Sequence, residues 1–194
     1  MTNLEQVQAN LSEAALVLHN FAASEENIAR VAEAAKLMSA SIAAGGKIIS
    51  CGNGGSMCDA MHFAEELSGR FRNDRRALPA IAASDPSHLS CVANDYGFDR
   101  AFARFVEALG NRGDVLLAIS TSGNSPSIVH AAEAARAQGL TVVALTGRSG
   151  GKLAPMANLS ICVAHDGYAD RVQELHIKII HTLIQLIEKN LNLA

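Results

Sequence analysis

The chain has 194 residues, of which 49% are hydrophobic and 18% are charged, and its formal net charge is −3 at pH 7. This hydrophobic content excludes an intrinsically disordered chain, and the length is typical of one domain with a single core. The acidic balance leaves no basic field that could hold nucleic acid, so an anionic ligand must be bound by local hydrogen-bond donors.

Two helices are predicted before the first strand. Apolar residues recur at helical spacing over residues 3–22. Ser24, followed by three polar residues, is typical of a helix start, and the helical pattern continues to about residue 44. Gly45 and Gly46 then end this second helix.

From residue 47 onward, short apolar runs alternate with helical patterns. The runs are apolar almost throughout, which is typical of parallel strands that are covered on both faces. This alternation predicts an α/β fold, a three-layer αβα sandwich with a five-stranded parallel sheet in a single domain over residues 1–194. Strands are expected at 47–51, 78–82, 115–119, 141–145 and 159–163, and helices at about 57–69, 87–94, 99–109, 126–137 and 170–191.

Nothing in the sequence indicates a membrane or secretory protein. Residues 1–5 carry neither the basic stretch nor the apolar core of a signal peptide. No apolar run approaches the ~20 residues that span a bilayer. Residues 177–187 are interrupted by Lys178, His181 and Gln185, and are predicted to form a buried helix. We therefore expect a cytoplasmic protein without a membrane partner.

The cysteines are expected to be free thiols. They show no Cys-x-x-Cys spacing, and most lie in apolar runs or on a helix face that is expected to be buried. Reduced, buried thiols in a cytosolic protein are the ordinary interpretation, and Cys51 is the cysteine that we expect to face a pocket. The four are Cys51, Cys58, Cys91 and Cys162.

Residues 120–125, which we call the serine loop, follow one predicted strand and precede Pro126 at the first position of a helix. The loop has four hydroxyl side chains and Gly123. Hydroxyls, inward-facing backbone amides and a helix N-terminus together can bind a phosphate without a lysine. The alternative is that the hydroxyls only cap the helix at Ser125. Phosphate binding is the favoured interpretation, at the carboxyl edge of the sheet.

Residues 52–56, the glycine loop, follow the first predicted strand at the same edge. Three glycines allow close backbone approach, and the Asn53 amide suits the hydroxyl or carbonyl groups of a polar ligand. The loop is neither a dinucleotide fingerprint nor a Walker loop. A tight turn without a ligand remains the alternative.

His62 and Glu66 lie four residues apart on the helix after the glycine loop, so their side chains share one face. They could bind a divalent metal or form an ordinary surface pair, whereas Glu65, rotated by about 100°, is expected to face elsewhere. His181 lies in an apolar run, where a histidine is more often a hydrogen-bonded core residue. Gln173 and His181 are about 12 Å apart along a helix axis. The two side chains can bind one ion only if both reach toward the middle of this ~12 Å span, or if they come from different copies of the chain.

Taken together, these motifs resemble the sugar isomerase (SIS) domain family, and more closely its bacterial phosphoheptose isomerases. The resemblance covers essentially the whole chain. It implies a flavodoxin-like SIS domain and a homotetramer with sites between subunits, in which residues 1–44 form a helical extension that packs on the domain and in the oligomer. It is carried by residues 50–56, 59–67, 69–71, 94–95, 119–125, 145–147 and 171–177.

The resemblance implies an isomerase that interconverts sedoheptulose 7-phosphate and D-glycero-D-manno-heptose 7-phosphate through an enediol, the first step toward ADP-heptose and the heptose of the lipopolysaccharide core. We assign Glu66 as the base and His181 as the acid. The implied metal is one Zn²⁺ per subunit, bound by His62, Glu66, Gln173 and His181. The implied substrate contacts are Asn53, Gly54, Gly55, Glu66, Asn94, Asp95, Ser120, Thr121, Ser122, Ser125 and Gln173, with Arg70 and Asp170 as supporting residues.

Several alternatives stay open. A non-enzymatic SIS tetramer could bind the replication initiator or sense a sugar phosphate, although the acid/base set favours an enzyme. Another phosphosugar could be the substrate, because pocket shape sets the length of the sugar. Glu66 could act mainly as a metal ligand or mainly as a base, and either subunit could supply each residue. Met57 lies at a position where the resemblance implies a variable or more polar residue, and we expect it to affect only the shape of the pocket rim.

Overall fold

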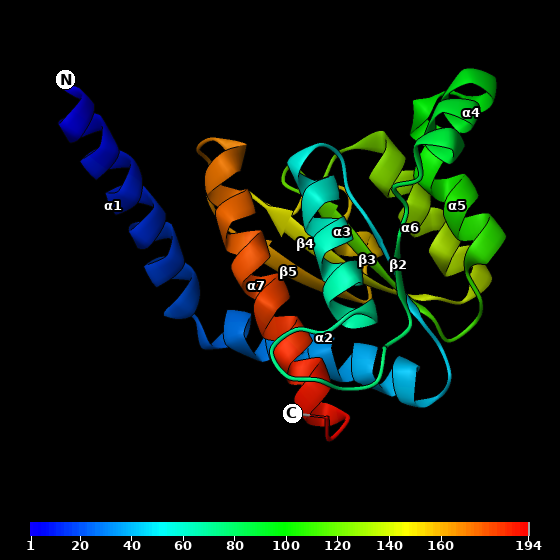
Figure 1. Ribbon diagram of the computed structural model, residues 1–194. Coiled ribbons are helices and arrows are strands. Elements are labelled where there is room, and N and C mark those ends of the chain that lie inside the picture. Colours follow the sequence, from blue (N-terminus) through cyan, green and yellow to red (C-terminus); the bar gives the residue numbers. More distant parts are fainter. Residues whose placement is uncertain (194) are drawn as a thin grey trace.

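One parallel sheet organises the computed structural model, which describes residues 1–193 (Figure 1). Its strand order is β2-β1-β3-β4-β5, and every pair of neighbours is parallel. Each strand lies where the sequence predicts one, with ends that differ by at most two residues. The strands are β1 (Ile48–Cys51), β2 (Ala80–Ala82), β3 (Val115–Ser120), β4 (Thr141–Gly147) and β5 (Leu159–Val163).

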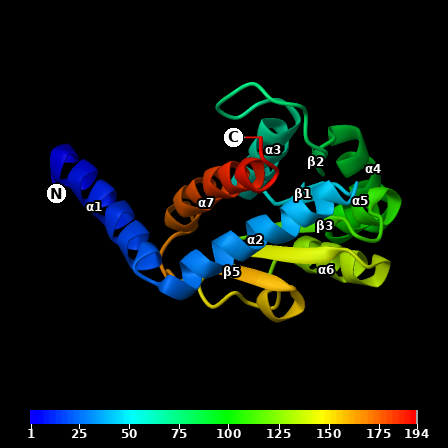
Figure 2. The same ribbon diagram turned by 90° about the horizontal axis from the view of Figure 1, so that it is seen from below.

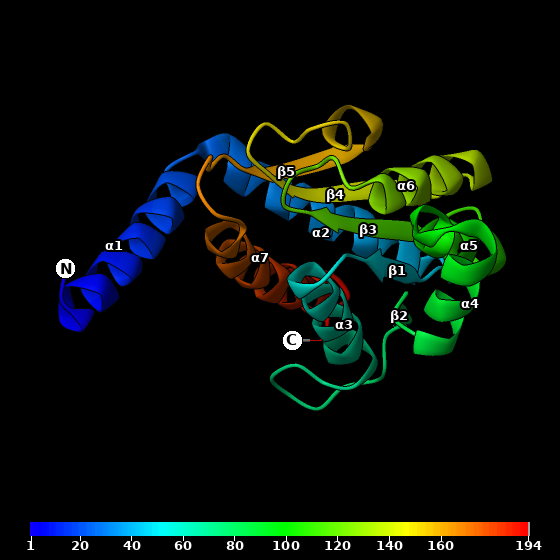
Figure 3. The same cartoon turned by 90° about the horizontal axis from the view of Figure 1, so that it is seen from above.

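Helices cover both faces of this sheet, as the αβα prediction requires (Figures 2 and 3). In the part of the chain that the structure describes, α2, α3 and α7 pack on one face, while α5 and α6 pack on the other. The helices are α1 (Asn3–Ala22), α2 (Glu25–Ala43), α3 (Gly55–Ser68), α4 (Pro86–Tyr96), α5 (Ala101–Leu109), α6 (Pro126–Gln138) and α7 (Ala169–Asn190), with 3₁₀ turns η1 (Phe98–Arg100) and η2 (Ala154–Met156).

Alternate residues of the central strands supply the two cores. In β3, Leu117 and Ile119 pack with α2, α3 and α7, whereas Leu116 and Ala118 pack with α5 and α6. This alternation follows from the pleat of a strand, and burial on both faces explains why the run is apolar throughout. The expectation of two covered faces is wrong for β2, where Ile81 is 39% exposed because the strand is short and lies at the edge of the sheet.

Helix α1 extends away from the body of the molecule (Figure 1). Thr2 and Glu5 form a capping box at its start, and only Val17 and Phe21 are buried. Leu11 is 64% exposed, and the apolar stripe that predicted this helix is therefore uncovered over most of its length. The packing of residues 1–44 in an oligomer remains a prediction.

The cysteines only partly meet the expectation. All four are free, and Cys51 is buried in the core, where burial raises the pKa of its thiol to about 12. It packs between the sheet and the α5–α6 layer rather than at a pocket. The expectation of burial is wrong for Cys58 and Cys91, which are exposed on the outer faces of α3 and α4. Within residues 1–193, none of the helices has the length and hydrophobicity needed to cross a bilayer.

Candidate active site

The carboxyl ends of β1 and β3 bring the glycine loop and the serine loop to one edge of the sheet. These strands are neighbours, and Cys51 pairs with Ala118 just before the two loops begin. Helices α3 and α7 also start at this edge and run side by side (Figures 1 and 3). Neighbouring elements thus carry the candidate site residues: the two loops follow β1 and β3, and the two helices are α3 and α7.

The serine loop forms a cup of hydroxyls at the start of α6. Ser120 and Ser125 approach each other with their Oγ atoms 3.2 Å apart. Ser125 occupies the N-cap position, but its side chain makes no capping hydrogen bond. The capping alternative therefore does not explain its hydroxyl. Ser122 Oγ accepts from the Asn124 amide at 3.1 Å. Together with the partial positive charge at the N-terminal end of α6, this arrangement suits a phosphate.

The segment after β4 supports the serine loop from outside, which the sequence interpretation missed. Gly123 has a φ of +64°, and a Cβ on it would collide with the Gly150 carbonyl. The Leu153 amide donates to the Gly123 carbonyl at 2.9 Å, and the Lys152 amide donates to Asn124 Oδ1 at 3.1 Å. The adjacent glycines at 150 and 151 were the available signal, because such close backbone contact requires them.

The glycine loop lies between α6 and α7. Asn53 Nδ2 donates to Ser127 Oγ at 3.0 Å, while Asn53 Oδ1 is buried without a hydrogen-bond partner. A buried amide oxygen without a partner is unfavourable unless a ligand or water satisfies it, which argues against a turn that binds nothing. Gly55 lies against Gln173 of α7, since a Cβ on Gly55 would be 2.8 Å from the Gln173 amide.

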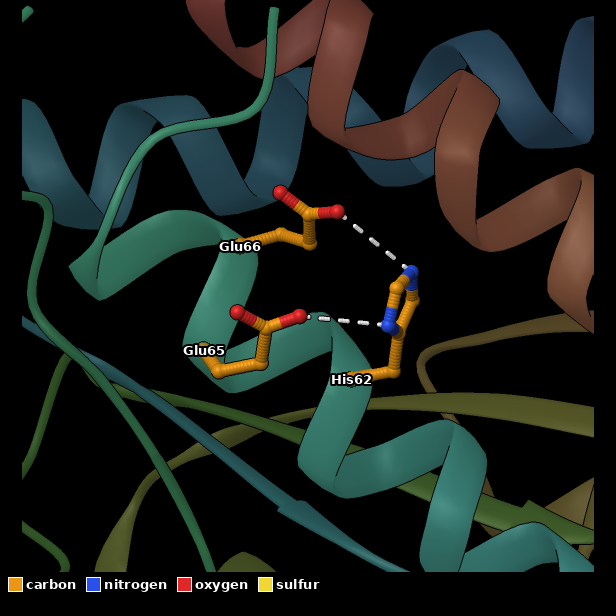
Figure 4. A group of neighbouring side chains, drawn as sticks. All are labelled: His62, Glu65 and Glu66. Carbon is orange, nitrogen blue, oxygen red and sulfur yellow. Dashed lines mark ion pairs between the residues drawn. The ribbon is translucent and has the colours of Figure 1, made fainter.

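His62 has an acidic side chain on each side of its ring (Figure 4). Its Nδ1 lies 3.2 Å from Glu65 Oε1 and its Nε2 lies 3.6 Å from Glu66 Oε1. The expectation that Glu65 faces elsewhere is therefore wrong. Residues three and four positions after His62 lie about 60° and 40° to either side of it, so both can reach the ring.

His181 of α7 completes this cluster. Its Nε2 lies 3.0 Å from His62 Nε2, and the Phe71 ring lies 5.7 Å from its ring centroid. Burial, followed by the neighbouring charge of His62, lowers the pKa of His181. The interpretation as an ordinary core histidine is wrong, because the ring points toward α3 and is only half-buried.

The donor set fits a zinc ion. Two imidazole nitrogens and a carboxylate oxygen are common zinc ligands, and tetrahedral Zn²⁺ with bonds near 2.1 Å separates its ligands by about 3.4 Å. The separations of 3.0 and 3.6 Å around His62 Nε2 bracket this value. Glu65 can accept from His62 Nδ1 and so keep the lone pair on Nε2. Gln173 lies against Gly55, two turns before His181 on α7.

Asp59 is a further site residue that the sequence interpretation did not use. It lies on α3 three residues before His62, is 8% exposed, and has one carboxylate oxygen without a partner. Burial raises the pKa of this carboxyl to about 6, and the charge of His62 opposes the rise. The signal available was the Asp-x-x-His spacing, which puts the two side chains on one helix face.

Four predicted residues are not brought to this cluster within one chain. Asn94 donates to its neighbour Asp95 at 2.7 Å, and both are exposed at the end of α4. Arg70 is exposed just after α3, and Asp170 is exposed in the first turn of α7. No hydrogen bond or ion pair among residues 1–193 joins any of the four to His62, Glu66 or His181.

Comparisons with known proteins agree with this architecture. The model of the SIS domain family matches residues 11–147. The phosphoheptose isomerase of Edwardsiella ictaluri is 61% identical over 95% of this chain and 96% of its own length, and that of Cytophaga hutchinsonii is 62% identical over 94% and 96%.

Comparison with solved structures indicates the same family. Phosphoheptose isomerase from Francisella tularensis matches with a TM-score of 0.90 at 39% identity, covering 97% of this chain and 100% of that one. The enzyme from Neisseria gonorrhoeae matches with a TM-score of 0.88 at 40% identity over the same shares. The family, the fold and the enzyme class expected from the sequence are thus confirmed. The chain belongs to the SIS domain family and, within it, to the phosphoheptose isomerases.

Proposed function

We propose that the chain interconverts sedoheptulose 7-phosphate and D-glycero-D-manno-heptose 7-phosphate, an aldose–ketose isomerisation that supplies heptose for lipopolysaccharide. The observation that carries this proposal is the approach of His181 Nε2 to within 3.0 Å of His62 Nε2, beside Glu66. It brings titratable groups together from α3 and α7, two helices that both start at the sheet edge carrying the serine loop. The names of the relatives supply the substrate.

Substrate binding is divided between the two loops. The hydroxyls of Ser120, Thr121, Ser122 and Ser125, with the positive end of the α6 helix dipole, hold the phosphate. The free Asn53 Oδ1 accepts a hydrogen bond from a sugar hydroxyl, and the glycine loop allows the sugar to approach the backbone closely. Because this phosphate site needs no lysine, it is compatible with the acidic net charge of the chain.

The chemistry is a proton transfer between C1 and C2 of the sugar. The Glu66 carboxylate removes the proton from one carbon and returns it to the other, and His181 exchanges a proton with the substrate oxygens. Glu66 Oε1 faces His62, so Oε2 remains available as the base. A bound Zn²⁺ would supply Lewis-acid polarisation of the carbonyl and hydroxyl oxygens.

The working enzyme in this proposal is a cytoplasmic homotetramer with one Zn²⁺ per subunit. The uncovered apolar stripe of α1 supports an oligomer, because an exposed apolar surface of this kind marks an interface. Asn94, Asp95, Arg70 and Asp170 are exposed, which leaves them available to a site that they share with a neighbouring subunit.

The test is an isomerase assay on a panel of ketose phosphates, followed by Glu66→Gln. We expect turnover of sedoheptulose 7-phosphate, and a loss of about 10²- to 10⁴-fold in kcat for Glu66→Gln with the assembly preserved. Glu107→Gln is the control, because Glu107 lies on α5, on the other face of the sheet, and its side chain pairs with Arg100 and Arg104. Near-normal activity of Glu66→Gln would remove its role as base. Turnover of a different ketose phosphate, or of none, would refute the proposed reaction.

A further inference from the structure

Arg75 is buried in a loop whose other arginines are exposed. The loop, residues 69–79, connects α3 to β2 and also carries Arg70, Arg72 and Arg76 at the surface. The Arg75 side chain is only 2% exposed. Burying a guanidinium is costly unless several acceptors compensate it, and the proposed chemistry does not require a cation at this position.

The guanidinium closes the C-terminal end of α3. Its Nη2 donates to the carbonyl of Glu66 at 2.7 Å, and its Nη1 donates to the carbonyls of Leu67 and Gly69 at 2.8 and 2.9 Å. Carbonyls in the last turn of a helix lack partners within the helix, and a cation is favourable there. One acceptor is thus the backbone of the residue that we propose as the base.

The same guanidinium joins this helix end to α7. Its Nε donates to Glu188 Oε1 at 2.7 Å, and Glu188 is buried in the last turn of α7. At the other end of the helix pair, Gly55 lies against Gln173. The two helices are therefore fixed together on both sides of His62, Glu66 and His181.

We infer that Arg75 is a positioning residue that, through Glu188, sets the distance between the Glu66 carboxylate on α3 and the His181 imidazole on α7. It does not contact substrate. The inference rests on the proposed function for its effect on turnover, but its effect on the metal site does not depend on the substrate. Lysine cannot replace it, because a single ammonium cannot reach Glu188 and three carbonyls at once.

The test compares Arg75→Lys and Glu188→Gln with Asp114→Asn as matched control. Asp114 is also a buried carboxylate paired with a cation, Lys47, and its side chain is 3% exposed against 7% for Glu188. It lies at the amino end of β3, at the opposite edge of the sheet from the site. The measurements are kcat and KM for sedoheptulose 7-phosphate, Zn²⁺ affinity by competition with a chromogenic chelator, and the urea midpoint.

We expect kcat to fall about 10- to 100-fold in Arg75→Lys and Glu188→Gln, with KM nearly unchanged because the serine loop is untouched. Zn²⁺ affinity should fall by about tenfold or more. Asp114→Asn should lower the urea midpoint by a similar amount but keep both kcat and Zn²⁺ affinity.

The positioning role is refuted if the two variants keep kcat and Zn²⁺ affinity, if Asp114→Asn loses as much of both, or if neither variant folds while the control does. If only Arg75→Lys fails to fold, the kcat and the Zn²⁺ affinity of Glu188→Gln decide whether the positioning role holds. A wild-type protein that binds Zn²⁺ without turning over the sugar would refute the proposed function alone, and the Zn²⁺ measurement would still decide the role of Arg75. A wild-type protein with neither property would refute both.

Discussion

Two titratable side chains, His176 and Asp59, are buried on the helices that form the site, and burial disfavours the charged form of each. The His176 ring is fully buried between α7 and β4, and its Nε2 donates to the Thr146 carbonyl at 3.0 Å. Its Nδ1 has no partner. Burial lowers the pKa of His176 to about 4, opposed only by that hydrogen bond, whereas burial raises the pKa of Asp59 to about 6. The two groups therefore affect stability in different ways as the pH falls.

His176 should make the protein less stable in mild acid. Its pKa is near 6.5 in the unfolded chain and about 4 in the folded one, so between these values only the unfolded chain binds the proton. Its contribution to the free energy of unfolding is complete above pH 6.5 and decreases as the pH falls toward 4, by about 3 kcal/mol in all. Urea unfolding from pH 7 to 4.5 measures this dependence.

The matched variant is His176→Gln, which keeps an N–H donor but does not titrate. We expect its unfolding free energy to vary less with pH over the same range, although it will be lower at pH 7 because the side chain packs less well. An equal pH dependence in the two proteins would show that His176 is not the group responsible.

Among the structural elements, the segment between β4 and η2 has the closest backbone contact with the site. Gly123 of the serine loop faces the Gly150 carbonyl, and Gly151 faces the backbone of Ser122 and Gly123. The hydroxyls of the serine loop therefore depend on a segment that contributes no hydroxyl to the cup. A change that separates the two segments should weaken phosphate binding more than it alters the cluster around His62.

Gly123→Ala should weaken phosphate binding. The new Cβ would collide with the Gly150 carbonyl, and the φ of +64° is itself unfavourable for alanine. We expect KM and the inhibition constant of inorganic phosphate to rise by about tenfold or more, equivalent to at least about 1.4 kcal/mol. Gly113→Ala is the control, because Gly113 has a φ of +93° but open space around its Cβ position. Equal effects of the two variants would mean that a general loss of stability, not a displacement of the serine loop, is responsible.

The sequence predicts these elements well because short runs that are apolar throughout alternate with longer segments in which apolar residues recur at helical spacing. The apolar run of β3 and the spacing along α7 each admit one interpretation, and both are confirmed. Contacts between elements cannot be predicted in this way. That His181 meets His62 follows from how α7 packs beside α3, which no local pattern specifies. The orientation of Glu65 could have been predicted, since residues i and i+3 also share a helix face.

On the scale of the whole molecule, most of α1 extends away from the two cores, and only Val17 and Phe21 near its end join one of them. Its exposed residues Leu4, Val7, Leu11 and Leu18 follow one another at intervals of three, four and seven positions and so form one stripe. Leu16 is also exposed but lies well outside that stripe. A stripe of this kind is stable in water only if another surface covers it, and a second copy of the chain is the partner that we propose.

Leu11→Glu should dissociate the oligomer without unfolding the subunit. Leu11 is 64% exposed within one chain, so the fold itself does not need this side chain, whereas a charge in an apolar interface is costly. Leu16→Glu, at a position that is 58% exposed, should leave the assembly intact. Sedimentation velocity gives the mass of each variant, and circular dichroism reports its helix content. A tetramer in both variants, or a monomeric wild type, would contradict the proposed interface.

The two imidazoles that meet at the site lie 119 residues apart in the chain. His62 precedes four of the five strands, and His181 lies on the last helix. During synthesis, the serine loop, the glycine loop and the first imidazole all leave the ribosome well before the second imidazole does. The two imidazoles therefore meet only after α7 has left the ribosome and packed beside α3, later than the two loops are synthesised.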